Sequence, residues 1–355
     1  MRFLRNTWYV AMWSQDLKPG ELQQRLILDE AIVLFRNASG QVAALLDRCP
    51  HRFVPLSLGK VCEGNSVQCP YHGLAFDATG VCVRNPNADG RIPPALRVRR
   101  FPVVERHGAI WVWMGDREAD PALIPDFSVL DEEIGGQTID RRWIRVAANY
   151  ELMTYNILDI SHTNTLHAGI LGNEDTFHYE IHSEEKGNSF YLYRKFRNVR
   201  PIRVNQLMFH KDVERVDQWA DMRWDAPGCI LNDAGVCPPG GTLADGTGLY
   251  GVHFLTPESA SSTLYHFCGV RRNPVTRSPE EEAAIGREMA ELRRIAFDEQ
   301  DRRMLEAQQQ SLDRAGGFGA LRAVPLSTDA ATMKYQRILY RMIEAESGIP
   351  VTSTA

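Results

Sequence analysis

Residues 49–52 read CPHR and residues 69–73 read CPYHG, so each of two short segments carries one cysteine and one histidine. Cysteine and histidine are common ligands of zinc and iron in proteins. Taken singly, such residues would be ordinary core cysteines and surface histidines. Four of them in two segments that both open on Cys-Pro favour a single metal site built from Cys49, His51, Cys69 and His72.

The spacing distinguishes two kinds of metal site. A structural zinc site usually takes thiolates from a segment in which about two to four residues separate two cysteines. Here each segment pairs a cysteine with a histidine. One residue separates the two in the first segment, and two residues separate them in the second. A Rieske [2Fe-2S] cluster binds two cysteines on one iron and two histidines on the other. The sequence therefore predicts a Rieske cluster, and a zinc-stabilised interaction protein is the alternative.

The other five cysteines show no paired spacing. We expect them to be small buried apolar residues rather than ligands. They are Cys62, Cys82, Cys229, Cys237 and Cys268.

A second group of metal-binding side chains lies in residues 156–167, which read NILDISHTNTLH. Two histidines and one carboxylate form the arrangement that non-haem Fe(II) uses to bind O2 beside a substrate. His162 and His167 are five residues apart, about 500° around an ideal helix, so they converge only where the helix ends or distorts. Residues 163–165 (TNT) are poor helix formers, which favours such a distortion. Asp159 precedes His162 by three residues and can lie on its side of the helix.

The predicted carboxylate ligand comes from a long helix. Ser278 and Pro279 supply a helix start, and the helical pattern continues to about residue 310. Asp301 lies on a mostly apolar face, so its carboxylate needs a partner, either a metal or a buried arginine. Asp298 lies on a charged, solvated face. The positions assigned to the Asp301 face are Phe297, Met304, Leu305 and Gln308, and those beside Asp298 are Arg294 and Arg302.

The composition is that of a soluble globular protein. The chain has 355 residues, 44% hydrophobic and 24% charged, so it can bury a core without disulfides. A net charge of −5 without a basic block argues against nucleic acid as the main partner. No apolar run of about 18 residues predicts a membrane span, and the run 8–13 is too short for a signal-peptide core. Seven cysteines without an export signal then favour a cytoplasmic protein.

Strand and helix patterns divide the chain into two predicted domains. Apolar runs with turns at residues 37–40 and 107–108 predict a small antiparallel β domain in residues 1–119. The polar, proline-containing stretch 115–127 marks the boundary. In residues 120–355 we expect a helical segment, several strands, the long helix and a last helix. The predicted class is α+β, and the expected ranges are 147–168 and 330–346 for the helices and 190–196, 230–236, 251–255 and 263–270 for the strands.

With both metal motifs in this order, the chain resembles the Rieske non-haem iron aromatic-ring oxygenases over nearly its whole length. The motifs are CPHR, CPYHG and the pattern N-x2-D-x2-H-x4-H in residues 156–167. The segments WYVA (8–11), LSLGK (56–60) and LHAG (166–169) are similar to the vanillate O-demethylase and dicamba demethylase branch. The resemblance implies a Rieske domain followed by a helix-grip, START-like catalytic domain with an antiparallel sheet and a long C-terminal helix.

The resemblance also implies the ligands of two metal groups. One is the [2Fe-2S] cluster and the other is a mononuclear Fe(II). The implied cluster ligands are Cys49, His51, Cys69 and His72, and the implied iron ligands are His162, His167 and Asp301.

Four further positions match functional positions of the family, and a fifth departs from its pattern. Asp159 matches an aspartate that bridges the cluster of one subunit to the iron of the next, in a head-to-tail ring that is usually a homotrimer. Asn156 matches a polar residue near the iron. Asn232 and His253 match positions that contact a substrate carboxylate. Gln300 is a departure, because relatives usually carry glutamate there.

Strand alternation constrains His253 independently of the resemblance. It places His253 on the opposite face from Val252 and Phe254. The side chain is then either a solvated surface histidine or an inward, protonatable anchor for a carboxylate beside Asn232.

The expected reaction follows from the motifs present and absent. No G-x-G-x-x-G follows a strand and no flavin or plant-type ferredoxin motif occurs, so a separate reductase must supply electrons from NAD(P)H. The resemblance implies that O2 is activated at Fe(II) beside a bound small aromatic acid. Hydroxylation of the methoxy carbon of that acid then releases formaldehyde. N-demethylation and hydroxylation of a ring or alkyl carbon are alternative reactions, because pocket side chains set substrate choice. The alternative class is a non-catalytic Rieske electron carrier fused to a helix-grip binding pocket.

Overall fold

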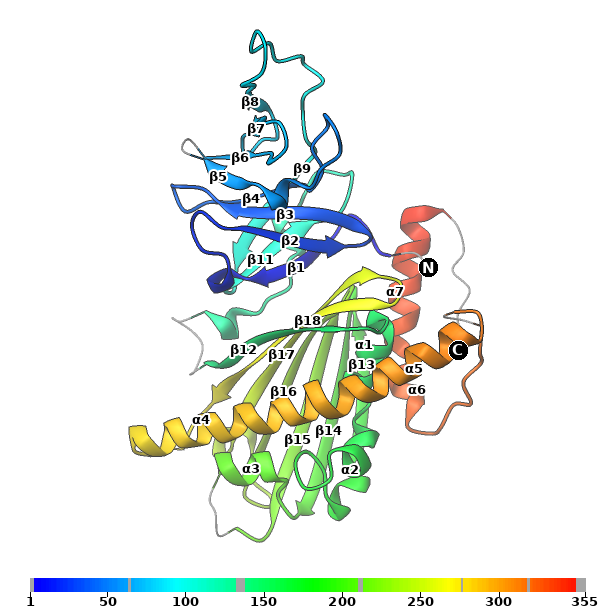
Figure 1. The fold of residues 1–355 in the computed structure, drawn as a ribbon. Coiled ribbons are helices and arrows are strands. Elements are labelled where there is room, and N and C mark those ends of the chain that lie inside the picture. Colours follow the sequence, from blue (N-terminus) through cyan, green and yellow to red (C-terminus); the bar gives the residue numbers. More distant parts are fainter. Residues whose placement is uncertain are drawn as a thin grey trace. The chain divides into compact units, whose positions relative to one another are not determined.

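The computed structural model describes residues 3–62, 65–131, 138–209, 213–275, 277–317 and 320–348. Its contacts group into two units (Figure 1). The N-terminal unit contains Arg5–Ile124 and Thr256–Ser259, and the C-terminal unit contains the rest of the chain. The structural division therefore falls inside the polar stretch 115–127. The functional boundary between residues 119 and 120 stays a prediction.

The N-terminal unit consists of three small antiparallel sheets with strand orders β1-β11-β10, β2-β3-β4-β9 and β5-β6-β7-β8. Both predicted hairpins are confirmed: residues 37–40 join β3 to β4, and residues 107–108 join β10 to β11. His107 and Gly108 have φ values of 55° and 67°, as a type I′ turn requires. The strands are β1 Trp8–Trp13, β2 Leu22–Ile27, β3 Glu30–Arg36, β4 Val42–Leu46, β5 Lys60–Cys62, β6 Ser66–Gln68, β7 Ala75–Phe76, β8 Cys82–Arg84, β9 Arg100–Phe101, β10 Val103–Arg106 and β11 Ala109–Trp113.

The C-terminal unit is built on a seven-stranded sheet with the order β12-β18-β17-β16-β15-β14-β13. Six of the strands lie side by side in chain order, and the first strand, β12, closes the other edge beside β18. All four predicted strands are present. The strands are β12 Thr138–Val146, β13 Glu180–Lys186, β14 Ser189–Val199, β15 Val216–Asp225, β16 Cys229–Cys237, β17 Thr247–Ser259 and β18 Ser262–Arg272.

Helices flank this sheet, and the predicted long helix crosses one of its faces (Figure 1). That helix starts as predicted: Ser278 caps it and forms a reciprocal capping box with Glu281. It is not uniform, because the π-helical segment Ile295–Asp301 joins α4 to α5. The predicted segment 147–168 is likewise divided, into α1, a 3-10 turn and α2. The helices are α1 Tyr150–Leu158, α2 Thr163–Leu166, α3 Arg203–Met208, α4 Pro279–Arg294, α5 Arg302–Arg314, α6 Asp329–Thr332 and α7 Lys334–Ser347.

The core of the C-terminal unit lies between the sheet and helices α1, α5 and α7. Phe190 and Trp224 from the sheet pack in one cluster with Leu305 of α5 and Ile338 of α7. No helix in the described parts of the chain is long and apolar enough to span a membrane. Four of the five cysteines predicted to be buried are buried, whereas Cys62 is half-buried and its thiol lies 3.3 Å from Gln68 Oε1.

Candidate functional site

Two loops of the N-terminal unit carry the four predicted cluster ligands, and the loops share one backbone design. The cysteine N–H donates to the carbonyl oxygen five residues ahead, at 2.9 Å from Cys49 and 2.8 Å from Cys69. The cysteine carbonyl accepts from the N–H four residues ahead, at 2.9 and 3.2 Å. That fourth residue is Phe53 or Gly73, with φ of 63° and 73°. The repeated left-handed turn gives both loops the same shape, so their ligands meet as two matched pairs.

The side chains on these loops fit a cluster with sulfur on one iron and nitrogen on the other. Cys49 and Cys69 are each 2% exposed, whereas the rings of His51 and His72 lie near the surface with centroids 4.4 Å apart. Burial and the adjacent Cys69 thiol raise the pKa of Cys49 to about 11. Two buried thiols side by side lose their protons readily only to a metal. The donor set therefore suits a Rieske cluster and not a C-x2-C zinc site.

The predicted iron ligands meet in the C-terminal unit because the segment between the histidines is not a regular helix. Helix α1 ends at Leu158, and the 3-10 turn Ile160–His162 leads into the single turn of α2. His167 then follows α2 as its C-terminal cap. The expected distortion between His162 and His167 is thus confirmed, and it brings their ring centroids to 5.0 Å.

Asp301 completes the group from the opposite helix. Its Oδ1 lies 3.1 Å from His167 Nε2 and 3.5 Å from His162 Nε2. One ligand atom from each of the three residues lies within 4.8 Å of the other two. Asn156 Nδ2 donates a hydrogen bond to Asp301 Oδ1 at 3.1 Å, so this predicted polar neighbour contacts the carboxylate. The arrangement is two imidazoles and a carboxylate around one small space, as in 2-His-1-carboxylate iron sites.

Hydrogen bonds on the far side of each ring fix which nitrogen faces the centre. His162 Nδ1 lies 2.6 Å from the backbone oxygen of Asp159, and His167 Nδ1 lies 2.7 Å from Gln300 Oε1. Both partners are acceptors, so each Nδ1 carries the proton and each Nε2 presents a lone pair. A metal requires this tautomer.

The protonation tendencies of the two rings also suit a metal. Burial lowers the pKa of His162 and outweighs the effect of Asp301. Burial also opposes protonation of His167, but the Asp301 carboxylate and Gln300 raise its pKa overall. His167 Nε2 is buried 3.1 Å from Asp301 Oδ1, and with the proton on Nδ1 neither of these two atoms can donate a hydrogen bond to the other. A cation held by Nε2 and the carboxylate would satisfy both groups, so the residues fit a mononuclear metal.

The π-helical segment explains how Asp301 faces this centre. Its last hydrogen bond runs from Arg302 N–H to Phe297 O, five residues back. A π turn takes more residues than the 3.6 of an α-helix, so residues four apart stay on one face. The buried stripe on this helix includes Met289, Arg293, Asp301, Leu305 and Gln309. The predicted face was partly wrong: Met304 is 43% exposed and Gln308 is also exposed, because the buried stripe of α5 continues from Asp301 in steps of four, through Leu305 and Gln309.

Asp298 lies on the solvated side of the same helix, as predicted. Its carboxylate forms an ion pair with Arg302 at 3.2 Å, and both side chains are about one-third exposed or more. The structure thus separates the two candidate carboxylates, because only Asp301 reaches the histidines.

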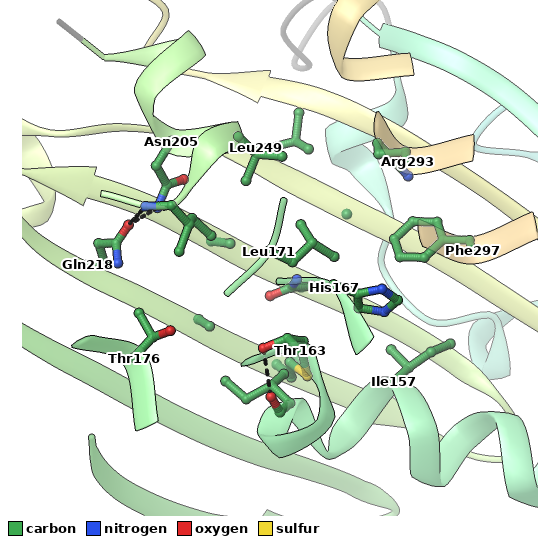
Figure 2. A pocket seen from close by; sticks show the side chains of 18 of the residues that line it. Ile157, Thr163, His167, Leu171, Thr176, Asn205, Gln218, Leu249, Arg293 and Phe297 are labelled. Carbon is green, nitrogen blue, oxygen red and sulfur yellow. Dashed lines mark hydrogen bonds between the residues drawn. The ribbon is translucent and has the colours of Figure 1, made fainter. Parts of the chain in front are cut away.

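A mainly apolar pocket opens beside the three predicted iron ligands (Figure 2). Its walls come from the sheet, from α3 and from the long helix, which contributes Phe297 and Arg293. Polar side chains are set into this mainly apolar surface, as is usual in sites that bind and orient small molecules. Apolar lining residues include Ile157, Leu171, Phe196, Met208, Met222 and Leu249.

Both predicted substrate-binding residues line this pocket. Asn232 pairs with Gly251 across β16 and β17, and His253 lies two residues further along β17. A Cβ at Gly251 would lie 3.1 Å from His253 Nε2, so the glycine leaves open space between the two polar side chains. Asn232 Oδ1 is buried and has no hydrogen-bond partner among the described residues. The alternative of a solvated surface histidine is wrong, because His253 is 3% exposed.

The expected protonation of His253 is also wrong. Burial, and then the positive charge of Arg293, lower the pKa of His253 to about 3. His253 Nδ1 lies 2.6 Å from the Tyr265 hydroxyl. When that hydroxyl donates to Nδ1, a neutral His253 presents Nε2–H as a donor. His253 can therefore offer a hydrogen bond to a ligand but not a positive charge.

Asp159 lies between α1 and the 3-10 turn, where its backbone orients His162. Its carboxylate accepts hydrogen bonds from Ser161 N–H at 3.0 Å and from Ser161 Oγ at 2.9 Å. The side chain is half-buried. The predicted bridging role needs a second subunit and stays a prediction.

Sequence reasoning missed two residues of the site. Gln300 contacts the imidazole of His167, and Arg293 lines the pocket with a buried guanidinium. Gln300 was noted only as a departure from the family pattern. Arg293 lies eight residues before Asp301, on the stripe that the π turn maintains. Counting back from Asp301 in steps of four residues, instead of alternating steps of three and four, would have placed Arg293 on the buried face of this helix.

Comparison with known proteins matches both units. Residues 7–102 match the Rieske [2Fe-2S] domain, and residues 146–345 match the vanillate O-demethylase oxygenase C-terminal domain. The dicamba O-demethylase oxygenase component of Stenotrophomonas maltophilia is 34% identical, over 98% of this chain and 100% of that protein. The chloroacetanilide N-alkylformylase oxygenase component of Rhizorhabdus wittichii is 33% identical, over 97% of each chain. The crystal structure of dicamba monooxygenase with 3,6-dichlorosalicylic acid has a TM-score of 0.90 at 32% identity, covering 98% of this chain and 100% of that one.

The two units and their donor sets define a Rieske non-haem iron oxygenase. The chain belongs to the branch of that family that contains the vanillate and dicamba O-demethylase oxygenase components. It is the oxygenase component of a monooxygenase system, and its cofactors are a Rieske [2Fe-2S] cluster and mononuclear non-haem iron.

Proposed function

We propose that this oxygenase component O-demethylates a methoxylated aromatic acid of the vanillate kind and releases formaldehyde. The observation that supports this proposal best is the mainly apolar pocket, whose lining includes the three predicted iron ligands together with Asn232 and His253. An apolar site with a few polar groups orients a flat ring and leaves one substituent beside the metal. The demethylase names of the relatives favour a methoxy group as that substituent.

In this proposal the four loop residues of the N-terminal unit hold the cluster, and His162, His167 and Asp301 hold the iron. When bound, these groups supply stored electrons and activation of O2. Gln300 and the Asp159 backbone keep both Nε2 atoms directed at the metal position. Asn156 donates to Asp301 Oδ1, which holds the carboxylate in place and leaves its other oxygen free of that bond.

The chemical balance determines what the rest of the system must provide. One oxygen atom of O2 enters a C–H bond of the methoxy carbon, and the resulting hemiacetal collapses to a phenol and formaldehyde. The other oxygen atom is reduced to water, and this reduction consumes two electrons and two protons. We assign the electrons to a separate flavin and ferredoxin-type reductase that oxidises NAD(P)H. The names of the relatives, which are oxygenase components, support a separate donor.

We further assign residues 1–119 to the Rieske domain and residues 120–355 to the catalytic domain of a cytoplasmic homotrimer. In the trimer, Asp159 of one subunit faces a cluster-ligating histidine of its neighbour. The backbone oxygen of Asp159 contacts His162, a predicted iron ligand, and this contact supports the role. A charge on the Asp159 side chain is thus close to the iron site. His51 and His72 lie near the surface of their unit, as an exchange of electrons between subunits requires.

Product analysis tests the proposed reaction. The purified oxygenase, with a surrogate reductase and NADH, is incubated with methoxybenzoates, with their N-methyl analogues and with methylbenzoates. We expect formaldehyde and a phenol in equal amounts from at least one methoxybenzoate. Formaldehyde only from N-methyl compounds would show N-demethylation, and hydroxylated products without formaldehyde would show hydroxylation. A preparation that binds zinc and no sulfide would contradict the enzyme reading altogether.

A further inference from the structure

One charged side chain in the pocket, that of Arg293, forms no ion pair with the described residues, and its terminal nitrogens are not hydrogen-bonded to them. Arg293 is 5% exposed, and neither Nη1 nor Nη2 has a hydrogen-bond partner among the described residues. Burial lowers the pKa of Arg293, but a guanidinium stays protonated in proteins. Burying an unpaired charge costs several kcal/mol by general estimates, about the whole free energy of folding of a marginal domain. A cation in this position therefore indicates an anion that the described residues do not supply.

Other buried arginines in the same unit have partners, which makes Arg293 distinctive. Arg194 Nη2 donates to the backbone oxygen of Leu158, and Arg271 Nη1 forms an ion pair with Glu282 at 3.0 Å. The carboxylate that most favours the charged form of Arg293 is Asp140, but it acts at a distance and is paired with Arg142 at 2.5 Å.

The surroundings of Arg293 hold its guanidinium in the pocket wall. Its Cζ lies 5.8 Å from the ring centre of Phe267 and 5.6 Å from that of Phe297. A Cβ at Gly269 would lie 2.1 Å from Nη1, so a larger residue there would displace the guanidinium from its present position. Figure 2 shows Arg293 and Phe297 extending from the same helix on the side of the pocket opposite Thr163. The guanidinium is thus packed between two rings and a glycine, and the described residues accept no hydrogen bond from its Nη1 or Nη2.

Arg293 also lies at a useful distance from the predicted iron position. It precedes Asp301 by eight residues on one helix face, about 12 Å along an ideal helix axis. Phe297 lies between them on that face and contributes its ring to the pocket. A substrate bound to Arg293 by one end would extend across Phe297 toward His167 and Asp301 with the other.

We propose that Arg293 is the specificity-determining residue that binds the anionic group of the substrate, a carboxylate or a sulfonate. This proposal deepens the proposed function, because it assigns the positive charge of the substrate site to Arg293 and leaves neutral hydrogen bonds to His253 and Asn232. A planar guanidinium fork matches the two oxygens of a carboxylate, which form paired charge-assisted hydrogen bonds with it. The aromatic ring then lies against apolar side chains, and the methoxy group faces the three iron ligands.

A binding experiment tests the role of Arg293 without turnover. Dissociation constants of the holoenzyme are measured by calorimetry under anaerobic conditions for 4-methoxybenzoate, 4-methoxybenzenesulfonate and 4-methoxybenzamide. For the Arg293→Gln variant we expect about tenfold to hundredfold weaker binding of at least one of the two anions and an unchanged constant for the amide. The anion that loses more identifies the carboxylate or the sulfonate as the preferred group.

Three further variants keep the proposal falsifiable. Arg293→Lys retains the charge but not the fork, so it should keep part of the preference for the anion. Arg302→Gln removes a half-buried arginine of the same helix that pairs with Asp298 and Glu306, and it should change none of the constants. His253→Ala should weaken binding of the anions and of the amide by the same factor, because a neutral hydrogen-bond donor can serve both kinds of ligand. The visible spectrum of the cluster and the unfolding midpoint show which variants fold.

The outcomes are distinct from those that test demethylation. An equal loss for the anions and the amide in Arg293→Gln, or a wild-type enzyme that prefers the amide, would overturn the anion site and assign Arg293 a packing role. If Arg293→Gln does not fold, two other results would overturn the anion site. One is an Arg293→Ala variant that still binds the anion more tightly than the amide. The other is loss of that difference in affinity in both Arg293→Lys and the control Arg302→Gln. Anion binding that depends on Arg293, without formaldehyde from any methoxy compound, would retain the site and reject the demethylase.

Discussion

At the scale of single residues, the three predicted iron ligands depend on atoms that do not touch the metal position. Asp159 supplies a backbone oxygen to His162, and Gln300 supplies a side-chain oxygen to His167. Only the second can be changed by substitution without altering the main chain. The difference makes Gln300 the informative position for testing how the site is oriented.

We expect Gln300→Ala to weaken iron binding by about tenfold to hundredfold, because the acceptor that fixes the His167 tautomer is lost. Gln300→Glu should retain iron, since a carboxylate accepts the same hydrogen bond. The measurement is mononuclear iron per chain after dialysis against a graded chelator. Glu299→Gln is the matched control, because Glu299 pairs with Arg294 in solvent. Equal iron retention in Gln300→Ala and the control would contradict the orienting role.

The second residue-scale prediction separates the two neighbouring carboxylates of the long helix. Asp301→Ala should abolish mononuclear iron and oxygenation and leave the colour of the cluster intact, because the cluster ligands lie in the other unit. Asp298→Ala should retain both, since it loses only an exposed ion pair worth at most about 1 kcal/mol. Iron analysis and the visible spectrum decide the question. Loss of iron in Asp298→Ala alone would show that the assignment of the ligand was wrong.

At the scale of elements, the sheet could be predicted from the sequence better than the helices could. Strands keep a period of two whatever surrounds them, so alternating runs such as 190–196 identified β14 directly. The helical pattern assumes 3.6 residues per turn, and it placed Asp301 and Leu305 correctly on the buried face. The predicted positions Met304 and Gln308 were wrong, because the buried stripe of α5 follows steps of four from Asp301, through Leu305 and Gln309.

The site shows the same limit of sequence reasoning. Metal ligands are few in kind and close in sequence, so His162 and His167 could be identified from spacing alone. Arg293 could not, because an arginine in a helix is normally assigned to solvent. Its burial depends on the absence of a side chain at Gly269, which lies on a strand. Such a contact between distant elements leaves no local pattern.

Packing between α1 and α7 leads to a prediction about pH. Glu151 is 2% exposed, and burial raises its pKa to about 7, although Tyr340 Oη donates to its Oε2 at 2.8 Å. The ordinary value is 4.5, so between pH 4.5 and 7 the folded state binds more protons than the unfolded state. Stability therefore falls as pH rises through this window, by about 3 kcal/mol in total from this one group.

Glu151→Gln should remove this loss, because an amide oxygen can still accept from Tyr340 and carries no charge. We expect the variant to unfold at a higher denaturant concentration than the wild type at pH 8, and the difference to shrink toward pH 5. Glu185→Gln, at an exposed position of the edge strand β13, serves as the control for a change of net charge. A stability difference that is the same at pH 5 and pH 8 would show that Glu151 does not titrate as proposed.

At the scale of the whole molecule, the proposed electron path requires contact between chains. Two ligand sets in separate units of one chain do not by themselves define that path. A head-to-tail ring closes by rotation, and each member then contributes its cluster to the iron of the next. A trimer of 40.1 kDa chains would have a mass of about 120 kDa in light scattering. A fully active monomer would refute this assembly.

Asp159→Asn tests the bridge within that ring. An asparagine side chain still accepts from Ser161 at this helix cap, and the backbone oxygen that orients His162 is unchanged. Both metal groups and the trimer mass should therefore be retained. The negative charge that would stabilise a protonated histidine of the neighbouring cluster is lost, so we expect oxidation of the reduced cluster in a single turnover to slow by about tenfold or more. Ser161→Ala leaves the charge and removes only one hydrogen bond, so its rate should stay close to that of the wild type. A wild-type rate in Asp159→Asn, with the trimer intact, would exclude Asp159 from the electron path.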